Sequence, residues 1–288
     1  GDTVAPELVK NYERAGISVV NSAVPQNFDL LVANTLYGGT FIAQMSGKIP
    51  TVLWVHEPTA GRRGIEQGIF LPEGLRLADS IIFPTRWQAE KLYEPYLGAR
   101  SFDIVPYGIQ TRTAPRKKPF SLPSGSISLL QLGWLDPRKG QHLTAAALDY
   151  LNDPRIHVFI AGSDAVNPKF AEQLKRRVSD EKHITNNVHF LGILDQDEVD
   201  AYLAHVDALV YPTNDDLISV AILEAMARKT CVISSDFGPI PETVIDDETG
   251  LLFPVGDVHA YQECIRRVAS DPNLRNRLAT SGNDFYRK

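Results

Sequence analysis

Nearly uninterrupted apolar runs alternate with amphipathic stretches along most of this chain, and that alternation limits the folds open to it. In the second half the candidate strands are IHVFIAG (156–162), NVHFLG (187–192), DALVYPT (207–213) and CVISS (231–235). The stretches between them place apolar residues at helical spacing, as Leu143, Ala147 and Leu151 do. Strands that are apolar on both faces and alternate with helices predict a parallel sheet with helices on both sides.

The first half carries the same pattern with shorter strands. Its candidate strands are residues 16–20, 28–34, 50–56, 79–84 and 102–106, and a helix is expected over 85–97. After a stretch rich in Pro, Lys, Arg and Ser, the alternation restarts at 126–133. A length of 288 residues fits two domains of roughly 150 residues each. We therefore predict an α/β protein with two doubly wound, Rossmann-like domains: residues 1–112, a linker at 113–125, and residues 126–288.

Composition excludes several classes of protein. The formal net charge of −6 argues against a nucleic-acid-binding surface, and the basic run at 112–119 is typical of a solvated linker. The two cysteines, Cys231 and Cys264, build neither a disulfide framework nor a zinc site, which fits a reducing compartment. No apolar run approaches the ~18 residues of a membrane span. We expect a cytoplasmic protein with at most peripheral contact with a membrane.

Open α/β sheets bind ligands beyond the carboxyl ends of their strands, which gives a short list of candidate site residues. In the first domain these positions are Asn34, His56 with Glu57, Thr85 with Arg86, and Tyr107 with Gly108. In the second domain they are Gly133 to Gly140, Gly162, Gly192, and Thr213 to Ser219. Two such edges that face each other predict a cleft between the domains.

The loop GWLDPRKG (133–140) brings Arg138 and Lys139 to the start of a helix near Gly140. Cations beside a helix N-terminus bind anions together with the free backbone N–H groups. A surface turn with a solvated lysine has the same pattern, and the loop alone does not decide between the two readings.

A stronger signal is Glu224, which lies within the apolar run SVAILEAMA of a helix predicted over 217–228. Burial of an unpaired carboxylate costs several kcal/mol, so Glu224 needs a partner. The partner is either a ligand diol, which offers two O–H donors, or an internal arginine or lysine. At ~1.5 Å rise per residue, Asp216 and Glu224 would lie roughly 10–12 Å apart, which is about the span of a nucleotide diphosphate sugar. The helix N-terminus would then meet the phosphates.

Five blocks in this order resemble the retaining glycosyltransferases of family 4, which have the two-domain GT-B fold. The blocks are IPTVLWVHEP (49–58), ADSIIFPTRWQAEKL (78–92) with IVPYGI (104–109), GWLDPRKG (133–140), Asp216 with LEAMA (223–227), and DFGPIPETVIDDETGLLFPVGD (236–257). The resemblance covers about residues 5–285. It implies an enzyme that moves a hexose from a nucleotide diphosphate sugar, UDP- or GDP-linked, to an acceptor with retention of anomeric configuration. The acceptor would be a glycan, a lipid-linked sugar or a protein.

The resemblance also implies roles for individual residues. Lys139, helped by Arg138, would neutralise the leaving diphosphate, Asp216 would touch the transferred sugar, and Glu224 would hold the ribose. His56 would lie across the cleft near the anomeric carbon. The remaining donor-binding positions would be Gly133, Gly162, Gly192, Ile193, Leu217, Ile218, Ser219 and Val220. The chemistry would need no metal and no cofactor, because lysine and the helix terminus stabilise the leaving charge.

The chain departs from the family pattern at several positions. Asp216 replaces the usual glutamate, Trp134 an arginine, and Leu217 to Ser219 the usual GFG. Lys229 stands where a glycine usually ends the helix. The resemblance further implies that the first domain is incomplete, without the family's N-terminal strand and glycine-rich loop, and that the last helices are missing. An alternative hypothesis is therefore a non-catalytic nucleotide-sugar or glycan-binding module.

Overall fold

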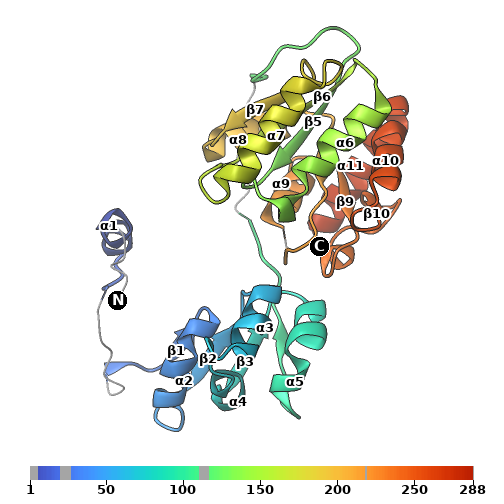
Figure 1. The fold of residues 1–288 in the computed structure, drawn as a ribbon. Helices are drawn as coiled ribbons and strands as arrows, with labels where there is room; N and C mark the ends of the chain where they lie inside the picture. Colours follow the sequence, from blue (N-terminus) through green and yellow to red (C-terminus); the bar gives the residue numbers. More distant parts are fainter. Residues whose placement is uncertain (1–5, 20–26, 110–116, 218, 288) are drawn as a thin grey trace.

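The computed structural model describes residues 6–19, 27–109, 117–217 and 219–287. Figure 1 shows two α/β bodies, one drawn in blue to cyan and the other in green to red. The strands of the first lie within residues 31–104 and those of the second within residues 127–253. The prediction of an α/β protein with two Rossmann-like domains is confirmed. Residues 110–116, which include the first four residues of the linker expected at 113–125, lie outside the described residues, and residues 117–126 contain neither helix nor strand.

Within the described residues, the first sheet has four parallel strands in sequence order, β1-β2-β3-β4. They are β1 (Leu31–Ala33), β2 (Thr51–Trp54), β3 (Ser80–Phe83) and β4 (Asp103–Ile104). Its helical segments are η2 (Leu36–Gly38), α2 (Gly39–Met45), α3 (Thr59–Glu66), α4 (Glu73–Leu77), the π-helical η3 (Gln88–Tyr93) and α5 (Glu94–Leu97). Leu53, Phe83 and Tyr93 are fully buried between the sheet and these helices.

The prediction of a strand at 16–20 is wrong for residues 16–19, the part that the structure describes. Helix α1 (Pro6–Arg14) ends just before it, and residues 17–19 belong to neither helix nor strand. The side chains of Ile17 and Val19 are 51% and 38% exposed. A β-rich run forms a strand only when a neighbouring strand pairs with its backbone, and here no described strand does.

The second sheet has six parallel strands in the described residues, in the order β10-β9-β8-β5-β6-β7. Their bounds are β5 (Ile127–Leu132), β6 (Ile156–Ala161), β7 (Val188–Gly192), β8 (Ala208–Tyr211), β9 (Cys231–Ser235) and β10 (Leu251–Phe253). The order reverses between β5 and β8, and such a reversal opens a crevice at the carboxyl ends of these two strands. The helical segments are η4 (Pro137–Lys139), α6 (Gln141–Leu151), α7 (Pro168–Asp180), α8 (Gln196–Leu203), α9 (Val220–Ala227), η5 (Ile240–Glu242), α10 (Val258–Ser270) and α11 (Pro272–Tyr286).

Alternate residues of the apolar strands fill two separate cores, one on each face of the sheet. Leu129 and Val158 pack with residues of α6, α7, α10 and α11, whereas Leu130 and Phe159 pack with residues of α8 and α9. This is why the strands are apolar throughout rather than at every second residue. Asp195 and Asp257 are the N-caps of α8 and α10, and the carboxylate of each accepts one or more backbone N–H groups of the helix that follows.

Candidate functional site

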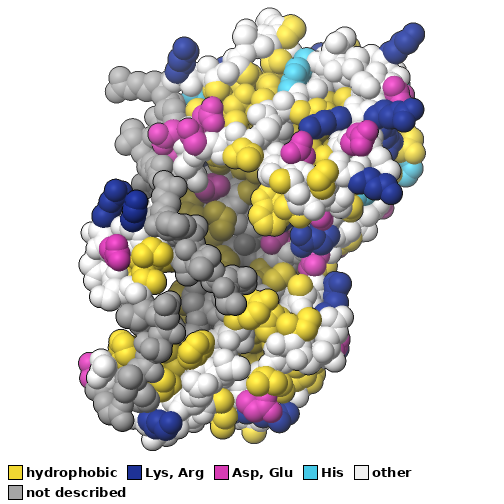
Figure 2. All heavy atoms as spheres, turned by 60° about the vertical axis from the view of Figure 1, so that its left-hand side comes forward, with side chains coloured by type: hydrophobic (Ala, Val, Ile, Leu, Met, Phe, Trp, Pro, Cys, Tyr) yellow, Lys and Arg dark blue, Asp and Glu magenta, His cyan; other side chains and the backbone are white. Residues whose placement is uncertain are grey.

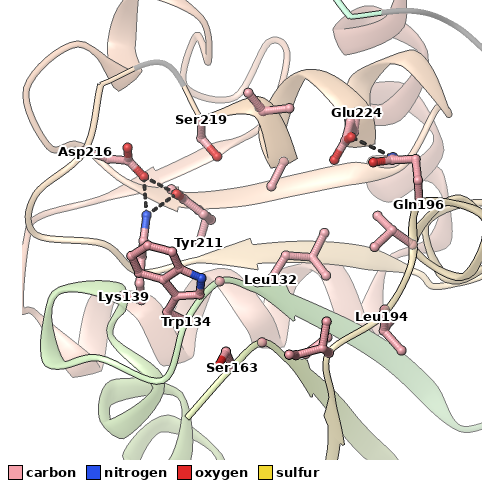
Figure 3. Close-up of a pocket in the computed structure, with 17 residues that line it drawn as sticks. Leu132, Trp134, Lys139, Ser163, Leu194, Gln196, Tyr211, Asp216, Ser219 and Glu224 are labelled. Carbon is pink, nitrogen blue, oxygen red and sulfur yellow. Dashed lines mark hydrogen bonds and ion pairs between the residues drawn. The ribbon is translucent and has the colours of Figure 1, made fainter. Parts of the chain in front are cut away.

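A cavity of about 480 Å³ lies at the carboxyl ends of β5, β6 and β8, where the strand order reverses. Figure 3 shows that polar side chains occupy two ends of it, with Lys139 and Asp216 at one and Glu224 with Gln196 at the other. The described residues that line it are Leu132, Gly133, Trp134, Lys139, Ala161, Gly162, Ser163, Ile193, Leu194, Gln196, Val199, Tyr211, Asp216, Ser219, Val220, Ala221 and Glu224.

The loop between β5 and α6 carries Lys139 to the cavity. Asp136 begins the short helix η4 by accepting a hydrogen bond from the backbone N–H of Arg138. Gly140 follows in the left-handed conformation, with φ of 73°, and a Cβ there would lie 2.0 Å from the carbonyl oxygen of Pro212. Only glycine therefore lets this loop pack against the end of β8. That contact brings Lys139 beside the last residue of the strand, Tyr211.

Lys139, Tyr211 and Asp216 form a closed polar cluster. Lys139 Nζ lies 2.6 Å from Asp216 Oδ2 and 3.0 Å from the hydroxyl oxygen of Tyr211. The Tyr211 hydroxyl donates to the same carboxylate oxygen. Burial, and then the charge of Asp216, raise the pKa of Tyr211 to about 12. Burial lowers the pKa of Lys139, but the electrostatic interactions and hydrogen bonds that it makes with Tyr211 and Asp216 outweigh burial and raise it. The lysine is therefore cationic and the tyrosine a neutral donor at neutral pH.

Helix α9 supplies the opposite end of the cavity. It begins at Val220, three residues later than predicted, because Ser219 is its N-cap and accepts a hydrogen bond from the N–H of Ile222. Asp216 therefore lies before the helix, and the separation expected from helical rise does not apply to it. The side chain of Glu224 reaches the cavity, where Gln196 Nε2 donates to Glu224 Oε1 over 2.8 Å. Glu224 is half-buried.

The other predicted site residues divide into two groups. Gly133, Gly162, Ile193, Ser219 and Val220 line the cavity, while Arg138, Gly192 and Leu217 are not among the described lining residues. The guanidinium of Arg138 pairs instead with Asp136, at 3.0 Å, and the Leu217 side chain is buried. Ile218 lies outside the described residues.

His56 belongs to the first domain and does not line this cavity. Its Nδ1 lies 2.6 Å from the Tyr107 hydroxyl, and its Nε2 lies 2.9 Å from Asn34 Oδ1. The amide oxygen of Asn34 only accepts, so Nε2 carries a proton, and in the neutral ring Nδ1 accepts from Tyr107. Burial lowers the pKa of His56, which favours this neutral form. Three of the strand-end positions predicted in the first domain therefore lie together.

The two domains meet beside the site. Thr59, at the start of α3, donates to Asp215 Oδ1 over 2.7 Å. The carboxylate of Glu242 accepts the backbone N–H groups of Arg86 and Trp87, at 3.0 and 2.5 Å. The space-filling view is hollowed between the two domains (Figure 2). The cleft that the strand ends predicted is thus bordered by Asp215, the neighbour of Asp216.

Sequence reasoning missed Tyr211 and Gln196. Tyr211 is the last residue of β8, whereas the candidates predicted at strand ends are residues that follow a strand. Gln196 begins α8, and nothing local in the sequence distinguishes it from a solvated glutamine.

The described part of the chain contains one group of possible metal ligands: Asp149, Glu181 and His183. Their ligand atoms lie within 4.8 Å of one another, but none of these residues lines the cavity. Of the described helices, none is long and apolar enough to cross a membrane.

A model of the family "Glycosyl transferases group 1" matches residues 114–285, more than half of the chain. The chain belongs to this family. Among curated relatives, glycogen synthase of Mycobacterium tuberculosis is 27% identical over 244 residues, which cover 80% of this chain and 57% of the relative. D-inositol 3-phosphate glycosyltransferase of Streptomyces bingchenggensis is 26% identical, covering 70% and 48%. The chain thus spans about half the length of the curated relatives it matches.

Solved structures share the whole arrangement. Sucrose-phosphate synthase from Thermosynechococcus elongatus superimposes with a TM-score of 0.72 at 21% identity, covering 98% of this chain and 73% of that one. Anabaena HepE in complex with UDP-glucose gives a TM-score of 0.75 at 18% identity, with coverage of 98% and 85%. At such identities the likeness shows the fold alone, and that fold is the GT-B fold of the group 1 glycosyl transferases.

Proposed function

We propose that the chain transfers a hexose from a nucleotide diphosphate sugar to an acceptor with retention of anomeric configuration. The observation that carries the proposal is the cavity at the reversal of the second sheet, with a cation at one end and a half-buried carboxylate at the other. A nucleotide diphosphate sugar needs both, a cation for its diphosphate and an acceptor for its ribose hydroxyls. UDP is the favoured nucleotide, since HepE of the same fold was crystallised with UDP-glucose.

In this proposal each end of the cavity has a separate task. Lys139 neutralises the charge that develops on the leaving diphosphate, together with the backbone N–H groups where α9 begins. Glu224, oriented by Gln196, accepts the ribose hydroxyls. Asp216 accepts hydroxyls of the transferred sugar, and His56 faces the reacting carbon from the first domain. No metal is required, so activity should survive chelation by EDTA.

A screen against UDP-, GDP- and ADP-sugars, by thermal shift and by turnover, tests the proposal. We expect at least one to bind. Loss of a charged hydrogen bond costs about 1.5–3 kcal/mol, so Lys139→Ala should weaken binding about 10- to 100-fold. Glu224→Gln should weaken it about 10-fold by the same reasoning. The control is Lys182→Ala, which removes an exposed lysine that does not line the cavity.

The possible outcomes separate the alternatives. Absence of any nucleotide-dependent shift in the wild type would refute the donor site. Binding without transfer to any of a broad set of acceptors would favour the non-catalytic module. NMR of the product decides retention, because an inverted anomer would contradict that part of the proposal.

A further inference from the structure

At the cationic end of the cavity, the polar side chains of Lys139, Tyr211 and Asp216 are bonded to one another. Asp216 Oδ2 accepts from both Lys139 and Tyr211, and Lys139 also donates to the Tyr211 oxygen (Figure 3). The second carboxylate oxygen, Oδ1, accepts the backbone N–H of Leu217 at 2.8 Å. The ammonium of Lys139 is therefore neutralised by a carboxylate that lies in the same cavity. A diphosphate that reaches Lys139 has to compete with Asp216 for it.

Tyr211 differs from Lys139 and Asp216 because its side chain is fixed in place and cannot move towards a ligand. It lies in the central strand β8 and is only 4% exposed. Its hydroxyl has a pKa of about 12, raised by burial, and so keeps its proton at neutral pH. Lys139, by contrast, has a long flexible side chain that is 19% exposed towards the cavity. The lysine can exchange partners while the tyrosine stays bonded to Asp216.

We propose, on the basis of the function proposed above, that the donor's diphosphate displaces Asp216 from Lys139, and that Tyr211 is the positioning residue that holds Asp216 after this exchange. The exchange couples the two parts of the donor. The carboxylate of Asp216 becomes available to sugar hydroxyls only when Lys139 has moved to the phosphates. Asp216 therefore adds little to the binding affinity of a free sugar, but it contributes fully to the binding of a sugar that is joined to a nucleoside diphosphate.

Calorimetric titration with UDP and with the UDP-sugar that binds best in the screen tests this exchange. Asp216→Asn frees Lys139, so UDP should bind about 5- to 50-fold more tightly than to the wild type, which lies within the usual range of coupling between linked sites. In the same variant the additional affinity that the sugar gives over UDP should disappear. A misfolded variant cannot bind UDP more tightly, so a gain in affinity in Asp216→Asn supports the exchange even if the variant is less stable than the wild type.

The control for charge alone is Asp215→Asn. Asp215 is the neighbouring residue, but its carboxylate accepts from Thr59, whereas Lys139 donates to Tyr211 and Asp216. General electrostatic attraction would tighten UDP binding to a similar extent in both variants. The exchange requires the gain in Asp216→Asn to exceed that in Asp215→Asn by at least about 5-fold, the lower end of typical coupling.

Tyr211→Phe tests the positioning role. Its affinity for UDP should stay within about 2-fold of the wild type, while kcat falls about 10-fold because Asp216 loses the bond that orients it during transfer. A tyrosine that only fills space would lower Tm and leave kcat of the folded enzyme unchanged. If the wild type binds no UDP or other nucleoside diphosphate, the proposed function fails. If the wild type binds but Asp216→Asn gains no affinity over Asp215→Asn, the exchange is refuted and the proposed function stands.

Discussion

Glu224 shows how a carboxylate can be accommodated in an apolar helix. Its neighbours Leu223, Ala225 and Met226 are buried in the domain, but Glu224 itself turns towards the cavity. The sequence left two partners open, a ligand diol or a basic side chain. The structure adds a partner that neither alternative included, the amide of Gln196. The amide of Gln196 orients the carboxylate and brings no charge of its own to the pair.

Gln196→Ala should therefore weaken binding of the donor, because the contact with the ribose suffers while the contact with the diphosphate is unchanged. We expect UDP to bind about 3- to 10-fold more weakly, as for the loss of one neutral hydrogen bond. The measurement compares UDP with its 2′-deoxy analogue in the wild type, Gln196→Ala and Glu224→Gln. The preference for the ribonucleotide should shrink in both variants. An undiminished preference would show that this carboxylate does not bind the ribose.

The residues of the site could be predicted where the sequence places them after a strand. Lys139, Gly162 and Asp216 were found in this way, and all three line the cavity. Arg138 was predicted from its place beside Lys139, but consecutive residues of a tight loop point in different directions, and its guanidinium turns to Asp136. Tyr211 could not be separated from the buried strand that contains it. A residue type and a spacing do not give the direction of a side chain.

At the scale of elements, the start of α9 decides where Asp216 lies relative to the cavity. Ser219 has extended backbone angles and caps the helix, so Val220 is its first residue and the preceding loop is free to place Asp216 beside Lys139. The apolar pattern alone extended the helix back to 217, because Leu217 continues the buried face. Capping competes with periodicity at such a boundary, and only the tertiary contacts of the loop resolve the competition.

The neighbouring strands β6 and β7 carry a pair of histidines, and we expect this pair to make the second domain sensitive to acid. His157 Nδ1 lies 3.2 Å from His189 Nε2, and the rings are stacked. Burial lowers the pKa of both, and the charge of His157 lowers that of His189 further. The unfolded chain therefore binds more protons than the folded one between these lowered values and the ordinary pKa of 6.5. Stability rises with pH through that window and is constant above it.

Urea unfolding at a series of pH values from 4.5 to 7.5 measures this effect. The wild type should lose stability below about pH 6.5, the ordinary pKa of histidine. His189→Gln should lose less over the same range, because one of the two groups no longer titrates and His157 no longer faces a second charge. His259→Gln, at the exposed start of α10, is the matched control and should follow the wild type. Equal slopes in His189→Gln and the wild type would contradict the prediction.

At the scale of the whole molecule, the sequence predicts two α/β domains but not how they meet. Thr59 and Asp215 are 156 residues apart, and Trp87 and Glu242 are 155 apart. No local propensity or periodicity carries information about such pairs. The strand ends predicted that ligand-binding edges face each other, because that follows from parallel topology alone. The contacts that fix the two edges in place depend on the packing of complete domains.

Glu242 is the clearest of these contacts. Its two carboxylate oxygens accept the first two N–H groups of the helical segment that follows β3, from Arg86 and Trp87, while Thr85 Oγ1 accepts the next, from Gln88. A carboxylate of one domain thus caps a helix of the other and lies where the helix dipole favours it. The Trp87 ring also packs against Phe237, with ring centroids 5.8 Å apart.

Glu242→Ala should therefore loosen the domains without changing the donor cavity, which lies wholly in the second domain. Loss of the cap should cost about 1–2 kcal/mol of stability between the domains. We expect UDP affinity within about 2-fold of the wild type, but a clear fall in kcat, because the proposed mechanism needs His56 of the first domain to stay in place against a donor held by the second. Scanning calorimetry should show thermal unfolding separating into two transitions. Glu248→Ala, an exposed acid a short distance along the chain, should change none of these. Unchanged kcat in Glu242→Ala would show that transfer does not depend on this contact, and weakened UDP binding would place Glu242 in the donor site itself.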